Sequence, residues 1–382
     1  MPIDFQPSWM DEDLAAYRDT VVRFLETEMA PADEEARRQK SVGREIWRRA
    51  GALGLLCTDI PEEYGGPGGD FRHEAIFYEE TSRRALNGMN TSVHAIVAHY
   101  LLNHGTPEQK QRYLPRLASG ELIGAIAMTE PGTGSDLQAV RTRADRTADG
   151  YVVNGSKTFI SNGGQAGLVV LVAKTDPEQR ARGVSLLLVE TENLQGYRVG
   201  RVLDKMGLHA QDTAELFFDD VKLPLDAVLG GVEGQGFYQL MSDLPYERTI
   251  IGVQAVAAME GAYEATLAYV RERRAFGQAI AEFQNTRFKL AEIATHVKVA
   301  RTFVDRCVNE LMAGTLDAAG ASMLKWWSTD LQGKVIDECL QLFGGYGYMN
   351  EYPIARMYAD ARVARIYGGT NEIMKEVISR SL

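Results

Sequence analysis

The sequence predicts an α+β protein of several domains, with a helical N-terminal region, a β-rich middle region and a helical C-terminal region. Two changes in hydrophobic periodicity support this order. Apolar residues recur at helical spacing up to about residue 121, short β-branched runs fill 122–235, and helical spacing returns over 236–382. With 382 residues, the chain is long enough for two or three domains of ordinary size. We therefore divide it into 1–121, 122–235 and 236–382.

Helices are expected to dominate the first 121 residues. Residues 11–39 carry apolar side chains at helical spacing after an acidic first turn. The cluster PEEYGGPGGD at 61–70 predicts a loop. A further helix is expected to begin in GTPEQ, with Thr106 as the N-cap and Pro107 as the first helical residue.

The middle region predicts a small β-domain, either a sandwich or a barrel. Its runs are short, rich in β-branched residues and separated by Gly, Asn and Asp. They are ELIGAIAMTE (121–130), GYVVNGSKTFISNGG (150–164), GLVVLVAKT (167–175), GVSLLLVET (183–191), GYRVGRVLD (196–204) and AELFFDDVKLP (214–224).

The C-terminal region predicts a bundle of helices. Residues 249–270 are apolar or small on nearly every face, which is typical of a helix buried on several sides. Residues 288–314 place one apolar stripe at helical spacing, which predicts a helix buried on one side.

Charge and motif content exclude several classes of protein. The net charge of −11 repels polyphosphate backbones, so we expect no nucleic-acid partner. The sequence has no GxGxxG, P-loop, HExxH or paired CxxC motif, and its six histidines lack metal-ligand spacing. We therefore expect no metal site.

The sequence predicts a cytoplasmic protein. Its first residues resemble neither an export nor a transit signal, and no run reaches the roughly 18 apolar residues of a membrane span. Cys57, Cys307 and Cys339 are far apart and odd in number, which indicates reduced thiols.

Four glycine-rich or arginine-rich stretches are candidates for ligand binding. MTEPGTGSD (128–136) can present backbone N–H groups and hydroxyls to a polar ligand, or it is only a loop between strands. TFISNGG (158–164) has the same two interpretations. QLFGGYGYMNEYP (341–353) suits a flat ligand or another subunit, or it is only a packed helix end. RERRAFGQAIAEFQ (271–284) is either a ligand-binding stretch or only a solvated charge cluster.

Taken together and in this order, these stretches resemble the acyl-CoA dehydrogenase family. The resemblance covers the whole chain, from PEEYGG to IYGGTNEIMKE (366–376), and is nearest to the long-chain and isovaleryl-type subgroup. It implies an N-terminal helical domain, a middle β-domain and a C-terminal four-helix bundle. It also implies FAD as cofactor, a homotetramer built as a dimer of dimers, and oxidation of a fatty or branched acyl-CoA to the trans-2-enoyl-CoA. The electrons would pass to an electron-transferring flavoprotein.

The resemblance also implies residues that hold the FAD. Contacts near the flavin ring are implied for Met128, Thr129, Gly134, Ser135, Phe159, Ile160 and Ser161, with Ser135 also near the substrate. Contacts to the diphosphate and adenosine are implied for Arg273, Phe276, Gln284, Gln341, Phe343, Gly344, Gly345, Thr370 and Glu372. A neighbouring subunit is expected to supply Arg273, Gln284 and the 341–345 loop.

The catalytic base has an unusual position under this resemblance. Many relatives carry a Glu where this chain has Gly368, whereas the long-chain and isovaleryl types carry it on the buried bundle helix. There this chain has Glu247, followed by Arg248 as an implied substrate contact together with Gly369. Gly368 keeps a backbone N–H for the thioester oxygen. The alternative interpretation is that Glu247, in the first turn of a helix, only complements the helix dipole.

Two other functions remain open to the sequence. A flavin oxidase on the same fold would differ only in the reaction of reduced flavin with oxygen. A non-enzymatic flavoprotein that binds acyl-CoA would explain the missing carboxylate at Gly368.

Overall fold

The computed structural model describes residues 5–382 and begins with a helical region. Its helices are α1 (Glu12–Phe24), α2 (Ala30–Gln39), α3 (Arg44–Ala52), α4 (Phe71–Arg83), α5 (Thr91–His104) and α6 (Pro107–Ala118). The helix expected over 11–39 is confirmed, but a π-helical turn, Leu25–Met29, joins α1 to α2. The expected start of α6 is also confirmed, because the Thr106 side chain accepts a hydrogen bond from the Gln109 N–H and Pro107 is the first helical residue.

The middle region forms one seven-stranded sheet in place of two packed sheets. Its strands are β1 (Gly124–Ala127), β2 (Arg143–Arg146), β3 (Gly150–Ser161), β4 (Leu168–Lys174), β5 (Val184–Glu190), β6 (Tyr197–Val202) and β7 (Thr213–Pro224). The order is β1-β4-β2-β3-β7-β6, with β5 also paired to β4, and the sheet curves into a half-barrel. The hydrophobic pattern of the sequence did not predict β2, because three of its four side chains are exposed.

Strand β4 is buried on both faces and joins two hydrophobic cores. Val169, Leu171 and Ala173 lie in the core of the β-domain, whereas the alternate residues of β4 pack into the core shared with the helices. Its continuous apolar run reflects this double burial.

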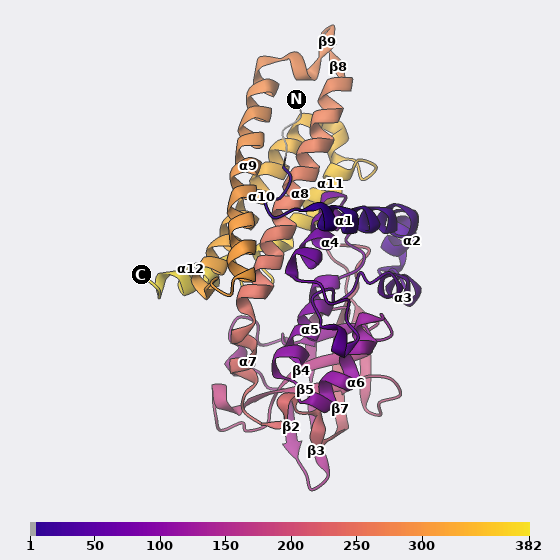
Figure 1. Ribbon diagram of the computed structural model, residues 1–382, viewed down its shortest axis with the longest axis vertical. Helices are drawn as coiled ribbons and strands as arrows, with labels where there is room; N and C mark the ends of the chain where they lie inside the picture. Colours follow the sequence, from indigo (N-terminus) through magenta and orange to yellow (C-terminus); the bar gives the residue numbers. More distant parts are fainter. Residues whose placement is uncertain (1–4) are drawn as a thin grey trace.

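The C-terminal region is built on three long helices (Figure 1). They are α8 (Leu244–Glu272), α9 (Gln284–Met312) and α10 (Ala318–Phe343), preceded by α7 (Gly236–Ser242) and followed by the shorter α11 (Pro353–Ala361) and α12 (Asn371–Ser379). The hairpin of β8 (Arg274–Ala275) and β9 (Gln278–Ala279) joins α8 to α9 at the end of the bundle remote from the β-domain (Figure 1). Within residues 5–382, no helix is both long enough and apolar enough to span a bilayer.

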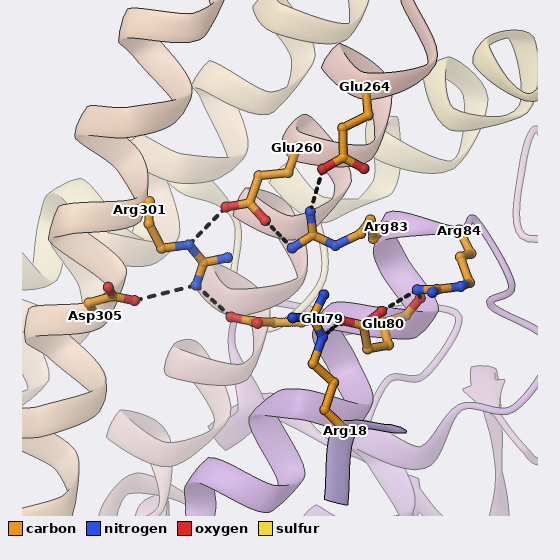
Figure 2. A network of polar contacts seen from close by, with 9 residues as sticks. All are labelled: Arg18, Glu79, Glu80, Arg83, Arg84, Glu260, Glu264, Arg301 and Asp305. Atoms are coloured by element: carbon orange, nitrogen blue, oxygen red, sulfur yellow. Dashed lines mark hydrogen bonds and ion pairs between the residues drawn. The ribbon is translucent and has the colours of Figure 1, made fainter. Parts of the chain in front are cut away.

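A buried ion network ties the N-terminal helices to the bundle (Figure 2). Arg301 of α9 donates to Glu260 of α8 at 2.8 Å and to Glu79 of α4 at 2.5 Å, and its side chain is only 2% exposed. Arg83 of α4 donates to the other oxygen of Glu260 at 2.5 Å. One guanidinium therefore links α4, α8 and α9. Burial raises the pKa of Glu79 to about 6, against the attraction of Arg301.

We expect Arg301→Ala to lower the free energy of unfolding by about 3–5 kcal/mol, because it removes the cation that binds the buried Glu79 and leaves Glu260 with Arg83 alone. Urea denaturation followed by circular dichroism measures the change. Arg306→Ala is the matched control on the same helix, since Arg306 is 76% exposed and its pair with Glu310 should contribute less than about 1 kcal/mol. Equal effects of the two substitutions would contradict the role given to the network.

Candidate active site

Glu247 is a buried carboxylate in the first turn of α8. It is 9% exposed, and its Oε1 accepts a hydrogen bond of 2.5 Å from the hydroxyl of Tyr100 on α5. Burial raises the pKa of Glu247 to about 7; the Tyr100 bond and Arg248 lower it, and Asp243 raises it further. The carboxylate thus titrates near neutral pH, where a proton acceptor is most effective.

The turn before α12 faces the same side of α8 as Glu247. Gly368 has φ +63°, and a Cβ at this position would lie 2.4 Å from Cδ1 of Ile251. Ile251 follows Glu247 by one helical turn, so the two residues share a face of α8. Ile251 therefore fills the space into which a side chain at position 368 would point. The Gly368 N–H has no hydrogen-bond partner among the described residues.

A polar cluster on α10 holds this turn in place. Nζ of the buried Lys325 donates to the Gly369 carbonyl at 2.7 Å and to Oδ1 of Asn371 at 2.8 Å. The Asn371 amide donates in turn to Thr329 and to Asp330, each at 3.0 Å. Gly369, at φ +85°, is crowded by Met374. The two glycines thus allow the positive φ angles of this turn. Lys325 fixes the turn through its hydrogen bond to the Gly369 carbonyl.

Arg248 lies beside Glu247 and points toward α10. Its Nη1 donates to the Ser322 hydroxyl at 2.8 Å, whereas its buried Nε has no partner among residues 5–382. Arg248 as a whole residue is only 4% exposed. One N–H of Arg248 is therefore left for a group outside this chain.

The loop 128–136 is fixed by a buried ion pair. Lys157 of β3 donates to Glu130 at 2.9 Å and to the Met128 carbonyl at 3.0 Å, and the Glu130 carboxylate also accepts the N–H groups of Arg141 and Thr142. Beyond this anchor the loop is open. Gly134 and Ser135 are exposed, and no atom would lie within 4 Å of a Cβ at Gly134.

The strand beside this loop presents an exposed aromatic ring. Phe159 is 67% exposed and has φ +60°, at an irregularity in the pairing of β3 with β7. Ile160 is buried in the core of the β-domain, so only its main chain can face a ligand, and Ser161 is partly exposed. Thr129 is bound to β3 through its carbonyl, which accepts the Thr158 N–H at 2.9 Å.

The other predicted cofactor residues lie at the opposite end of the bundle. Arg273 follows α8 directly, and its guanidinium lies 5.4 Å from the centre of the Tyr346 ring, in the turn that includes Gly344 and Gly345. Gln284 begins α9, Gln341 and Phe343 end α10, and Phe276 at the hairpin tip is 96% exposed. Thr370 and Glu372, by contrast, are at the start of α12, where the Thr370 hydroxyl accepts the Ile373 N–H.

Comparison with known proteins covers nearly the full chain. Models of the N-terminal, middle and C-terminal domains of acyl-CoA dehydrogenases match residues 11–121, 125–221 and 234–382. The chain belongs to the acyl-CoA dehydrogenase family. It is 49% identical over 369 residues to the mitochondrial long-chain specific acyl-CoA dehydrogenase of Mus musculus, covering 96% of this chain and 85% of the relative. It is 39% identical over 367 residues to an acyl-CoA dehydrogenase of Bacillus subtilis, covering 96% of each. A crystal structure of an acyl-CoA dehydrogenase from Geobacillus kaustophilus matches with a TM-score of 0.95 and 45% identity over 98% of this chain and 99% of that one.

The acyl-CoA dehydrogenases are oxidoreductases that act on CH–CH groups and use FAD, and this chain is one of them. Two features of the dehydrogenase fit a flavin. An exposed phenylalanine in a left-handed conformation, Phe159, suits a flat ring that covers it. The open loop at Gly134 and Ser135 lets a ligand approach the main chain closely.

Sequence reasoning missed three side chains of this site: Tyr100, Lys325 and Asn371. For Lys325 a signal was available, because buried Ser322, Lys325, Thr329 and Gln332 form a polar stripe at helical spacing on α10. A stripe of this kind inside a bundle predicts an internal hydrogen-bond network. No local pattern marks Tyr100, which only the fold brings to Glu247.

We expect Gly368→Ala to destabilise the dehydrogenase more than Gly314→Ala. Both glycines have positive φ, but nothing lies within 4 Å of a Cβ at Gly314. Gly314→Ala should therefore lower the free energy of unfolding by only about 1–2 kcal/mol, whereas Gly368→Ala must also displace Ile251.

A double-mutant cycle with Ile251→Val tests the contact, because valine lacks Cδ1. Gly368→Ala should be less destabilising in the Ile251→Val background than in the wild type. Additive effects of the two changes in urea denaturation would show that Ile251 does not occupy this space.

Proposed function

We propose that Glu247 is the general base with which this dehydrogenase takes the α-proton of an acyl-CoA thioester, leading to the trans-2-enoyl-CoA. The observation that carries this proposal is a buried carboxylate of raised pKa opposite a glycine whose side-chain space is already filled by Ile251. No carboxylate can enter from position 368 without moving Ile251. This supports a base on α8, where Glu247 is the buried carboxylate on the same helical face as Ile251.

The groups around Glu247 have separate tasks in the proposed reaction. Oε1 is engaged by Tyr100, which leaves Oε2 to accept the proton. Negative charge that develops on the thioester oxygen needs donors, and the N–H of Gly368, which has no partner among residues 5–382, is a candidate on the turn held by Lys325. Arg248 and Ser135 are proposed to contact the substrate. When bound, FAD supplies the acceptor for the β-hydrogen and its electron pair.

We infer a long fatty acyl chain as the preferred substrate. The support is the 49% identity with the long-chain specific enzymes of mouse, rat and pig, compared with 37% for a short-chain specific enzyme of Clostridium acetobutylicum. An electron-transferring flavoprotein is the proposed electron acceptor. A solved structure of an electron-transferring flavoprotein of Acidaminococcus fermentans is similar to this chain, with a TM-score of 0.91 and 36% identity. A cytoplasmic location stays a prediction.

The length of α8 supports an FAD site shared between subunits, because Glu247 and Arg273 lie at opposite ends of this helix. Twenty-six residues of continuous helix separate Glu247 from Arg273, which corresponds to about 39 Å. A single FAD molecule cannot reach both ends of α8. The residues of the hairpin end, including the exposed Phe276, are therefore proposed to bind the FAD of a neighbouring subunit in a homotetramer formed as a dimer of dimers.

We expect Glu247→Gln to lower turnover by about 10²- to 10⁴-fold, because the amide cannot accept the α-proton. FAD content and acyl-CoA affinity should change little. Anaerobic long-chain acyl-CoA should bleach the flavin absorbance of the wild type and leave that of the variant unchanged. Glu264→Gln, at an exposed position on the same helix, is the control with normal turnover. Near-normal turnover of Glu247→Gln would end the assignment.

The rate should also depend on pH in a defined direction. A base whose pKa is raised to about 7 is protonated and inactive below that value, so kcat/KM should rise with pH through about 7. Glutamate at its ordinary pKa of about 4.3 would give no change in this range. Hydrogen peroxide yield in the same assays separates a dehydrogenase from a flavin oxidase.

We expect the FAD-loaded enzyme to be at least a dimer in light scattering. Arg273→Ala with Phe276→Ala should reduce FAD retention, while the same change at exposed Arg306 should not. An FAD-loaded monomer would exclude the shared site.

A further inference from the structure

We propose that Tyr100 is the positioning residue of the catalytic base: its hydroxyl holds Oε1 of Glu247, so that Oε2 alone is presented to the substrate. This inference rests on the proposed role of Glu247. It adds a residue on α5, outside the segments that carry the recognisable motifs.

The first support is that Tyr100 comes from a fixed element. The ring of His94, on the same helix α5, accepts the Gly124 N–H at 3.0 Å through Nδ1 and donates to the Leu117 carbonyl at 3.0 Å through Nε2. His94 and Tyr100 are both fully buried. Helix α5 is thereby locked to β1 and to the end of α6. A donor on such an element can dictate the orientation of its acceptor.

The second support is that Tyr100 is the sole hydrogen-bond donor to the Glu247 carboxylate among residues 5–382. A carboxylate with one oxygen engaged has a defined rotamer and one free oxygen. Burial and the nearby Glu247 raise the pKa of Tyr100 well above 10, so the phenol stays neutral and donates throughout the working pH range. Donation to a charged oxygen stabilises the carboxylate relative to the acid.

The other charged groups near Glu247 cannot replace this bond. Asp243 repels the carboxylate and Arg248 attracts it, but neither donates a hydrogen bond to it. Without the tyrosine hydroxyl, only the attraction of Arg248 would oppose the rise in the pKa of Glu247 that burial causes.

Tyr100 is also dispensable for joining the two helices. Asn103 donates to Oδ1 of Asp243 at 2.9 Å, and His104 lies 3.0 Å from the Ser242 hydroxyl. These contacts already connect the end of α5 to the start of α8. Loss of the Tyr100 hydroxyl should therefore leave the helices together and change the state of the base.

The test is the pH dependence of Tyr100→Phe in the FAD-loaded enzyme, assayed with a long-chain acyl-CoA and an artificial electron acceptor. The acid limb of kcat/KM should move to higher pH by about one to two units, since hydrogen bonds to charged groups have this strength. The kcat/KM near pH 7 should fall by about 5- to 50-fold, as a shift of one to two units from a pKa of about 7 requires, and part of the loss should be recovered at higher pH. A merely structural role would lower the rate equally at every pH.

Tyr246→Phe is the matched control. Tyr246 is the neighbour of Glu247 on α8, and its hydroxyl donates to Asp59 at 3.0 Å, away from the base. This variant loses a buried hydroxyl in the same helical turn. Its acid limb should coincide with that of the wild type.

The outcomes separate the two proposals. An unchanged acid limb in Tyr100→Phe, with Glu247→Gln inactive, overturns the role of Tyr100 alone. An active Glu247→Gln overturns the base and Tyr100 together. If Tyr100→Phe does not retain FAD, 3-fluorotyrosine at position 100, a stronger donor, should move the acid limb to lower pH. An unmoved limb in that protein also overturns the proposal.

Discussion

The buried guanidinium of Arg301 is the constraint on which the placement of the bundle depends (Figure 2). A charge with 2% exposure is tolerable only when carboxylates meet it with good geometry, and Glu79, Glu260 and Asp305 come from three different helices. This requirement fixes the position of α8 along its axis and its rotation about that axis, since Glu260 also has to accept a hydrogen bond from Arg83. Glu247 lies on the same helix about 20 Å away, so its direction is set by an interaction that never touches it.

The region around Glu247, the proposed base, is a junction of three elements that are fixed independently. Helix α8 is fixed by the ion network, α5 by the His94 ring, and the Gly368–Gly369 turn by Lys325. Each contributes one group: a carboxylate, a hydroxyl and an N–H that has no partner among residues 5–382. The precision of the site thus comes from buried polar contacts, while the apolar packing of α8 supplies the low dielectric that raises the pKa of Glu247 to about 7.

Periodicity predicted the elements well because it reports burial directly. The all-round apolar pattern of 249–270 is confirmed by contacts of α8 with α4, α9 and α10, and the continuous run of β4 by its two cores. Periodicity did not predict β2, because its side chains are mostly exposed and its pairing with β3 therefore requires no alternating apolar residues. Glu247 and Gly368 were found through the family resemblance. Tyr100 was not, because its partner is 147 residues away and a tyrosine in an apolar helix otherwise indicates only core packing.

The contact between Gly368 and Ile251 bears on how this arrangement of the base can change during evolution. Returning the carboxylate to the turn needs a side chain at a left-handed residue and a smaller neighbour at position 251, while Glu247 has to be given up. A glutamate at position 368 alone meets Ile251, and under the proposed assignment loss of Glu247 alone leaves no base. Under that assignment, each single step is expected to reduce stability or activity. Two lineages that differ in the location of this carboxylate would be separated by a fitness valley, and the descendants on each side would keep the solution they inherited.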